Sequence, residues 1–153
     1  MSSVPIITEI KNKIDIAVNT ISDIEEVHTF PFVSTIFELM MYPAVLIYLE
    51  PTNWENRNRL ERHDVNINIE VWYEVSEDVE KLSTQGELLE ALVHQAIFTS
   101  CGDKINGLAK YIQKITKNPP DYQFPQEGLG VVKMQYAISY LTVWGNGFSQ
   151  ANY

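Results

Sequence analysis

The most constraining feature of this sequence is the stretch 65–75, where apolar and polar residues alternate strictly. One set consists of Val65, Ile67, Ile69, Val71, Tyr73 and Val75. The other set consists of Asn66, Asn68, Glu70, Trp72 and Glu74. Successive side chains of a strand point to opposite faces of the sheet, so this pattern predicts a long strand with one buried face. The second face, which carries Trp72, is expected to meet water or a partner.

Other stretches extend the predicted sheet. Apolar residues alternate again over 132–140, which predicts a second long strand. The compact apolar run 44–49 predicts a buried strand ended by Pro51, and a short extended segment is expected at 26–30. The polar stretch 52–59 is expected to be a protruding loop or the tip of a long hairpin. Residues 33–41 are compatible with either a helical turn or an apolar loop.

Helical spacing appears in three places. Ile7, Ile10, Ile14, Val18 and Ile21 form the stripe of an N-terminal amphipathic helix. A capping box from Thr84 to Glu87 predicts a helix that runs to about Ser100 and stops at Gly102. Asp103 is expected to cap a third helix, whose apolar stripe is Ile105, Leu108, Ala109, Ile112 and Ile115.

The order of these elements predicts the fold class. Helices cluster along the sequence and do not alternate one for one with strands, which favours α+β. We expect a mostly antiparallel sheet with helices packed on one face. Residues 1–144 are expected to form a single domain. Residues 145–153 are expected to be a C-terminal tail, mobile or docked on a neighbour.

Composition excludes several classes of function. The chain of 153 residues has 20 acidic against 11 basic residues and a net charge of −9, so nucleic-acid binding as the main activity is disfavoured. The single Cys101 excludes an internal disulfide and a cysteine-based zinc site, and it suits a reducing compartment. The first twenty residues match neither a signal peptide nor a membrane span, so we expect the protein to stay where it is made.

The sequence contains no motif of known catalytic chemistry. His28, His63 and His94 each stand alone, and there is no nucleophile-elbow or phosphate-loop pattern. His94 and Cys101 lie seven residues apart on a predicted helix, where they would share a face as a nucleophile pair. The favoured interpretation is a buried cysteine that acts as a small apolar side chain. We therefore expect no enzyme, no cofactor and no metal site.

The charges are unevenly distributed along the chain. Residues 70–90 contain seven acids and one lysine, whereas 104–117 contain four lysines and no acid. Lys110, Lys114 and Lys117 would form one stripe on the predicted third helix. This stripe is either a solvated face or a basic surface that meets an acidic one on an identical subunit, which would close a ring.

A second candidate contact is the polar stretch around Trp54. Together with Arg57, Arg59 and Arg62 it is interpreted as an interface loop. The other interpretation is that Trp54 covers the edge of the sheet while the arginines pair with Glu55 and Glu61. The full set of predicted interface residues is Trp54, Arg57, Arg59, Arg62, Glu70, Trp72, Glu74, Lys110, Lys114 and Lys117.

In the order, length and hydrophobic character of its elements, the chain resembles the tail terminator (tail-completion) proteins of long-tailed bacteriophages. The likeness covers about residues 5–143. It is carried by the N-terminal amphipathic helix, the strand Pro43–Leu49 and the strand Asn66–Val75. The helical region before Asp121 and the closing strand that ends at Tyr140 also carry it.

The resemblance implies a virion structural protein. Its subunits would form a homohexameric ring that caps the tail tube, stops tube elongation and offers a joining surface to the head–tail connector, while DNA only passes through the lumen. The protein would be found in the host cytoplasm during assembly and then at the head-proximal end of the virion tail, without contact to a membrane. The alternatives are another head–tail connector or tube component, or a small cytoplasmic binding domain or enzyme around His94 and Cys101.

Overall fold

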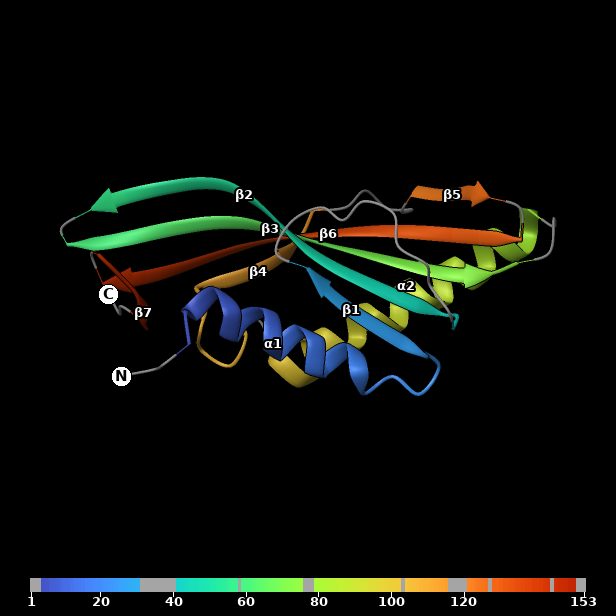
Figure 1. Cartoon of the computed structure of the whole chain (residues 1–153), viewed down its shortest axis with the longest axis horizontal. Coiled ribbons are helices and arrows are strands. Elements are labelled where there is room, and N and C mark those ends of the chain that lie inside the picture. Colours follow the sequence, from blue (N-terminus) through green and yellow to red (C-terminus); the bar gives the residue numbers. More distant parts are fainter. Residues whose placement is uncertain are drawn as a thin grey trace.

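The computed structural model describes residues 4–30, 41–57, 59–75, 79–102, 104–115, 121–126, 128–143 and 145–150. Side chains are not described at 30, 51–57, 79–82, 121–126 and 148–149. Within these ranges the chain forms two helices and seven strands (Figure 1). They are α1 (Ile6–Asn19), β1 (Glu26–Phe30), β2 (Ala44–Arg57), β3 (Leu60–Glu74), α2 (Val79–Cys101), β4 (Tyr111–Lys114), β5 (Asp121–Gln126), β6 (Leu129–Val143) and β7 (Asn146–Gln150).

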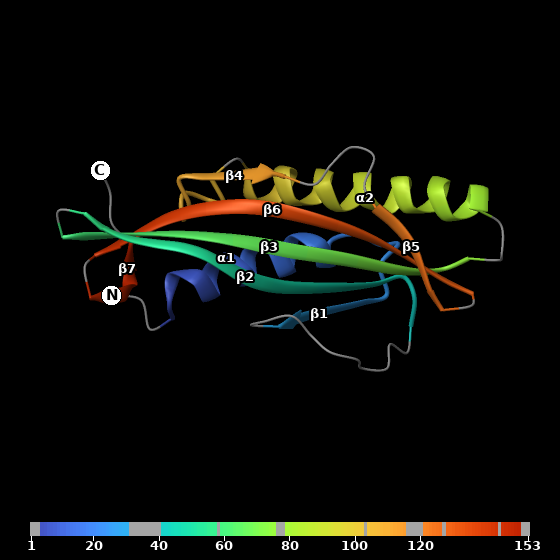
Figure 2. The ribbon, with the colours of Figure 1, turned by 90° about the horizontal axis from the view of Figure 1, so that it is seen from above.

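The described strands form one sheet, whose central order is β1-β2-β3-β6-β4. β5 and β7 also pair with β6. Only β1 and β2 run parallel, and all other pairs are antiparallel. Both helices lie on the same side of the sheet (Figures 1 and 2). The expected α+β class, with a mostly antiparallel sheet and helices on one face, is confirmed.

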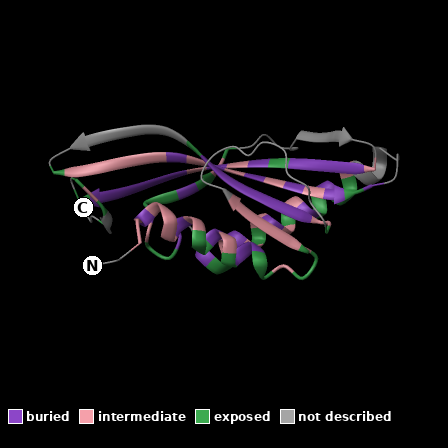
Figure 3. Ribbon diagram, viewed as in Figure 1, coloured by how far each residue is buried: buried purple, intermediate pink, exposed green. Residues whose placement is uncertain are grey.

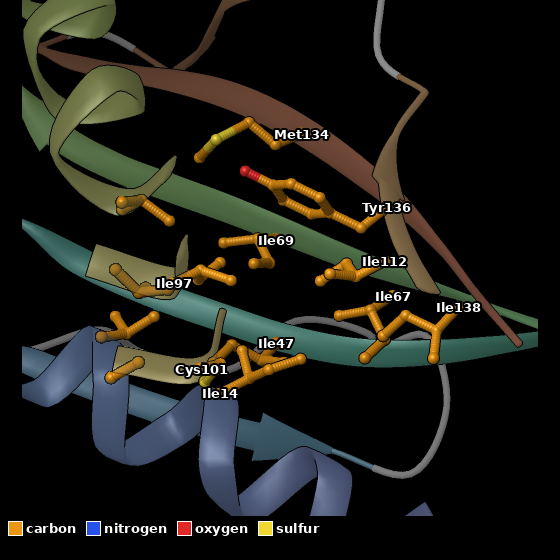
Figure 4. Packing of buried hydrophobic residues seen from close by; sticks show 14 of the residues in the cluster. Ile14, Ile47, Ile67, Ile69, Ile97, Cys101, Ile112, Met134, Tyr136 and Ile138 are labelled. Atoms are coloured by element: carbon orange, nitrogen blue, oxygen red, sulfur yellow. The ribbon is translucent and has the colours of Figure 1, made fainter. Parts of the chain in front are cut away.

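The core lies between the helices and the inner face of the two longest strands (Figure 3). The alternate apolar residues predicted in 65–75 and 132–140 are all buried. In the register Ile69 lies opposite Met134 and Ile67 opposite Tyr136, so both strands contribute to the same layer (Figure 4). Helix α1 adds a stripe at the predicted spacing, with Ile10 and Ile14 fully buried.

The strand β2 does not end at Pro51, as the sequence predicted, but continues to Arg57. Residues 52–57 and Arg59 therefore lie at the distal end of a long β2–β3 hairpin, which is the second of the two structures that the sequence left open. A β-bulge lies between Pro51 and Asn53. Proline has no N–H to donate, which is tolerated where one side of a strand is an edge. Arg59 adopts a φ of 68° at the turn before β3.

The predicted capping box is wrong, because α2 begins at Val79 and Thr84 lies inside the helix. The predicted third helix is also wrong. Turns and the strand β4 occupy that stretch, and consecutive positive φ angles at Ile105, Asn106 and Gly107 are incompatible with a right-handed helix.

The apolar residues of this stretch still reach the core, since Ile105, Ala109 and Ile112 are buried, although Ile115 is 42% exposed. At the C-terminus, where the sequence predicted a tail without regular structure, Asn146–Gln150 forms β7. This strand pairs with β6 of the same chain.

Candidate interaction surface

The face of the sheet opposite the helices is largely polar along β3. Asn66, Asn68, Glu70 and Trp72 are all partly exposed there, and Glu74 is exposed at the end of the strand. These residues alternate with buried ones that face the helices, because a strand turns successive side chains to opposite faces. Trp72 therefore lies on the helix-free face, where the sequence analysis placed it.

Glu70 fixes the two aromatic side chains of this face. Its Oε2 accepts a hydrogen bond from the Tyr48 hydroxyl at 2.5 Å, and its Oε1 accepts one from Trp72 Nε1 at 3.0 Å. Burial raises the pKa of the Tyr48 phenol, and the hydrogen bond to Glu70 and its negative charge raise it further. The phenol consequently remains a donor. A charge-assisted bond of this kind holds the indole ring of Trp72 in one orientation.

A second carboxylate sits further along the same face. Glu50 Oε2 lies 3.4 Å from the side-chain nitrogen of Asn68 and 3.4 Å from that of Gln135. These three residues come from three neighbouring strands. Lys133 lies opposite Glu70 in the register of β6. Cross-strand polar contacts thus follow β3 on this face, which also carries buried apolar residues such as Leu46 and Val131.

The arginine group lies at the distal end of the β2–β3 hairpin. Arg62 Nε is 3.2 Å from Asp64 Oδ1, and the hydrogen bond to Asp64 raises the pKa of this guanidinium. Arg59 is exposed at the turn. Trp54 and Arg57 lie in β2, opposite His63 and Leu60 in the register. These predicted interface residues therefore lie close together, but they belong to two paired strands and the turn between them, not to a loop.

The lysines do not form the predicted helical stripe. Lys110 is exposed in the turn before β4, whereas Lys114 is the last residue of β4 and forms an ion pair with Glu90 of α2. Burial lowers the pKa of Lys114. Lys117 lies outside the described residues. Lys114 thus connects the sheet to the helix layer, and Lys110 stays at the edge of the sheet.

His94 and Cys101 make separate contacts. His94 Nδ1 lies 2.9 Å from the Tyr136 hydroxyl, and its ring packs against Phe98. The Cys101 thiol is buried and donates to the Lys13 carbonyl oxygen at 3.5 Å. Burial raises the pKa of this thiol, although the charge of Lys13 lowers it slightly. Neither contact is that of an activated cysteine nucleophile.

A cluster of side chains around His63 was not predicted from the sequence. The imidazole stacks on Tyr140 with ring centroids 4.7 Å apart, and its Nε2 lies 2.9 Å from Thr142 Oγ1. Glu61 Oε2 lies 3.6 Å from the same nitrogen, while Glu61 Oε1 accepts the Gly145 N–H at 2.9 Å. Burial lowers the pKa of His63. The sequence contained one sign of this placement. His63 lies two residues before Val65, so it belongs to the set of alternate residues whose side chains face the helices.

Among the described residues, no group of histidine, cysteine and carboxylate side chains is arranged to hold a metal ion. No helix in the described part of the chain is long and apolar enough to span a membrane. No protein-family model matches the chain, and no curated protein matches it either.

Proposed function

We propose that this chain is the subunit of a phage tail terminator, a homohexameric ring that caps the tail tube, stops its elongation and presents a joining surface to the head–tail connector. The observation that carries the proposal is the fold itself. A single mostly antiparallel sheet is covered by helices on one face only. The other face carries Trp72 fixed by Glu70, as suits a contact surface.

The charge of the helix-free face supports this role. DNA must slide through such a ring, so the surface that it passes must not neutralise phosphates. Glu50 and Glu70 share this face with Asn66, Asn68 and Gln135, and Lys133 lies opposite Glu70. Carboxylates and neutral amides repel a phosphate backbone or leave it unbound.

The first test is the mass of the purified chain by light scattering at low and high salt, with electron microscopy of the same samples. We expect six-fold rings with an open channel. Added to growing tail tubes of the same particle, the chain is expected to stop elongation and to appear at the head-proximal end. Unchanged tube lengths, with the chain absent from that end, would contradict the proposal.

The hairpin tip supplies a variant test. Charge reversal by Arg57→Glu and Arg59→Glu is expected to reduce ring formation and the joining of tails to heads, because both positions lie at the end of the β2–β3 hairpin. Lys11→Glu combined with Lys13→Glu on α1 is the matched control, with an equal charge change away from the hairpin. Normal assembly of the double variant would remove the hairpin tip from the interface.

A further inference from the structure

One boundary of the sheet contains a long strand edge with which no other strand of the described residues pairs. β1 pairs with β2 only from Ala44 to Tyr48. From Leu49 to Arg57, no described strand lies beside the outer side of β2, and Figure 1 shows this half of β2 at the margin of the sheet. We call Leu49–Arg57 the β2 edge. Such an edge presents a row of backbone N–H and C=O groups that template the addition of another strand.

At the opposite boundary of the sheet, the strand β4 lies at the same height along the strand direction as the β2 edge. Asn53 lies opposite Asp64, Asp64 lies opposite Ser139, and Ser139 lies opposite Tyr111 of β4. The β2 edge of one molecule and β4 of another can therefore meet without a shift along the strands. In the sheet β2 and β4 run in opposite directions. Copies related by rotation about an axis parallel to the strands would thus pair antiparallel, the more stable arrangement.

The boundary at β4 also carries two large side chains that are partly exposed. Tyr111 is 39% exposed at the first residue of β4, and Ile115 is 42% exposed directly after its last residue. Backbone bonds from Lys110 N to Ser139 O and from Ile115 N to Gln135 O hold this whole segment against β6. We call 110–115 the β4 edge. Its rigid backbone makes it a preformed acceptor for a strand.

The two edges differ in charge. The β2 edge contains Glu50 and Glu55, with Arg57 at its end, and the β4 edge contains Lys110 together with Lys114, which is paired with Glu90 of α2. Lysines on an edge strand oppose indiscriminate pairing. Opposite an acidic strand the exposed Lys110 favours one partner, which is the β2 edge of a second copy.

We propose that identical subunits join head to tail by antiparallel pairing of the β2 edge of one copy with the β4 edge of the next. The contact is heterologous, so each subunit still offers one edge of each kind, and a suitable rotation closes the assembly into a ring. This inference deepens the proposed function and rests on it, because it names the contact that would build the ring.

Disulfide trapping between mixed variants tests the contact. The Asn53→Cys chain is mixed with the Tyr111→Cys chain and oxidised, and each variant is also oxidised alone. Cysteines bridge only when their Cα atoms lie within about 7 Å. Within one chain, β2 and β4 are separated by β3 and β6, three strand spacings of about 4.8 Å each, so only an intermolecular bond can form.

We expect a disulfide-linked dimer in the mixture and none above the wild-type level in either variant alone. The chain that carries both substitutions should give a ladder of covalent oligomers that ends at the size of the ring. The matched control replaces Tyr111→Cys by Gln95→Cys, an exposed position on α2. That mixture should give no dimer. The wild-type chain controls for Cys101, which is buried.

The outcomes separate the two proposals. Rings by light scattering without a bond in the mixture would overturn the edge pairing and leave the ring intact. A dimer from Asn53→Cys alone would show that two β2 edges pair with each other, which also overturns it. The specific bond in a sample that never forms rings, with tube growth unaffected, would support the pairing and overturn the terminator function.

Discussion

The imidazole of His63 stacks on the ring of Tyr140, with centroids 4.7 Å apart and an interplanar angle of 11°. The pair joins β3 to β6, and Tyr140 belongs to the buried core cluster. Burial raises the pKa of Tyr140 to about 12 and lowers the pKa of His63, so both rings are neutral near pH 7. Thr142 Oγ1 lies 2.9 Å from His63 Nε2 and holds the imidazole in place.

Stability is expected to fall on acidification because of His63. Its pKa in the folded chain lies below the ordinary 6.5, so the unfolded chain binds the proton more readily. The contribution is complete above pH 6.5 and is lost as the pH falls through the lower folded value. Glu61 and Asp64 oppose the shift, and burial outweighs them.

The measurement is the thermal midpoint between pH 8 and 5 for the wild-type chain and for His63→Phe, which keeps an aromatic ring against Tyr140. The variant should lose less stability over this range. His28→Phe is the control, since His28 is partly exposed on β1 beside Glu26. Parallel pH curves for the wild-type and His63→Phe chains would contradict the assignment to His63.

Glu70→Ala is expected to lower the free energy of unfolding by about 1–3 kcal/mol. The change removes the acceptor of both the Tyr48 hydroxyl and the Trp72 indole N–H. Glu74→Ala on the same face should change stability by less than about 0.5 kcal/mol, because Glu74 is exposed. Denaturant titration measures both values. Equal effects of the two variants would mean that Glu70 does not organise this face.

Much of the fold could be predicted from periodicity. Strict alternation identified β3 and β6, because each is long and has one buried face. Helical spacing of apolar residues identified α1, because this helix also buries one face. The stretch 105–115 failed because its apolar spacing suits both a helix and a turn followed by a strand. Gly107 was the one residue in the sequence that argued against a helix here, because glycine readily adopts a positive φ, and it has a φ of 83° in the turn.

The candidate surface was only partly predictable. The parity of Glu70 and Trp72 placed them on one face, and their hydrogen bond follows from that i, i+2 relation. No local pattern could pair Tyr48 with Glu70 or Lys114 with Glu90, because those contacts depend on strand order and on where a helix crosses the sheet. Long-range pairing of this kind is set by the whole topology and not by neighbouring residues.

The ion pair between Lys114 and Glu90 is expected to couple α2 to β4. Both side chains are largely shielded from water, with exposed fractions of 23% and 13%. A double-mutant cycle with Lys114→Met and Glu90→Gln should give a coupling energy of about 0.5–3 kcal/mol. Lys110→Met replaces an exposed lysine at the other end of β4 and provides the control cycle with Glu90→Gln. A coupling energy near zero in both cycles would contradict the proposed coupling of α2 to β4 by the ion pair between Lys114 and Glu90.

Cys101 is expected to react slowly with thiol reagents in the native chain. Its side chain is buried in the same cluster as Ile14 and Ile97, and burial raises the pKa of the thiol (Figure 4). Both effects lower the population of accessible thiolate, which is the reactive species. Labelling with a chromogenic disulfide at pH 7 should therefore be slow until denaturant unfolds the chain.

His94→Ala tests the remaining catalytic interpretation. If His94 activates the thiol, its removal should make labelling of the native chain slower, whereas a packing role predicts unchanged or faster labelling. Rapid native labelling that depends on His94 would favour chemistry at this position over packing.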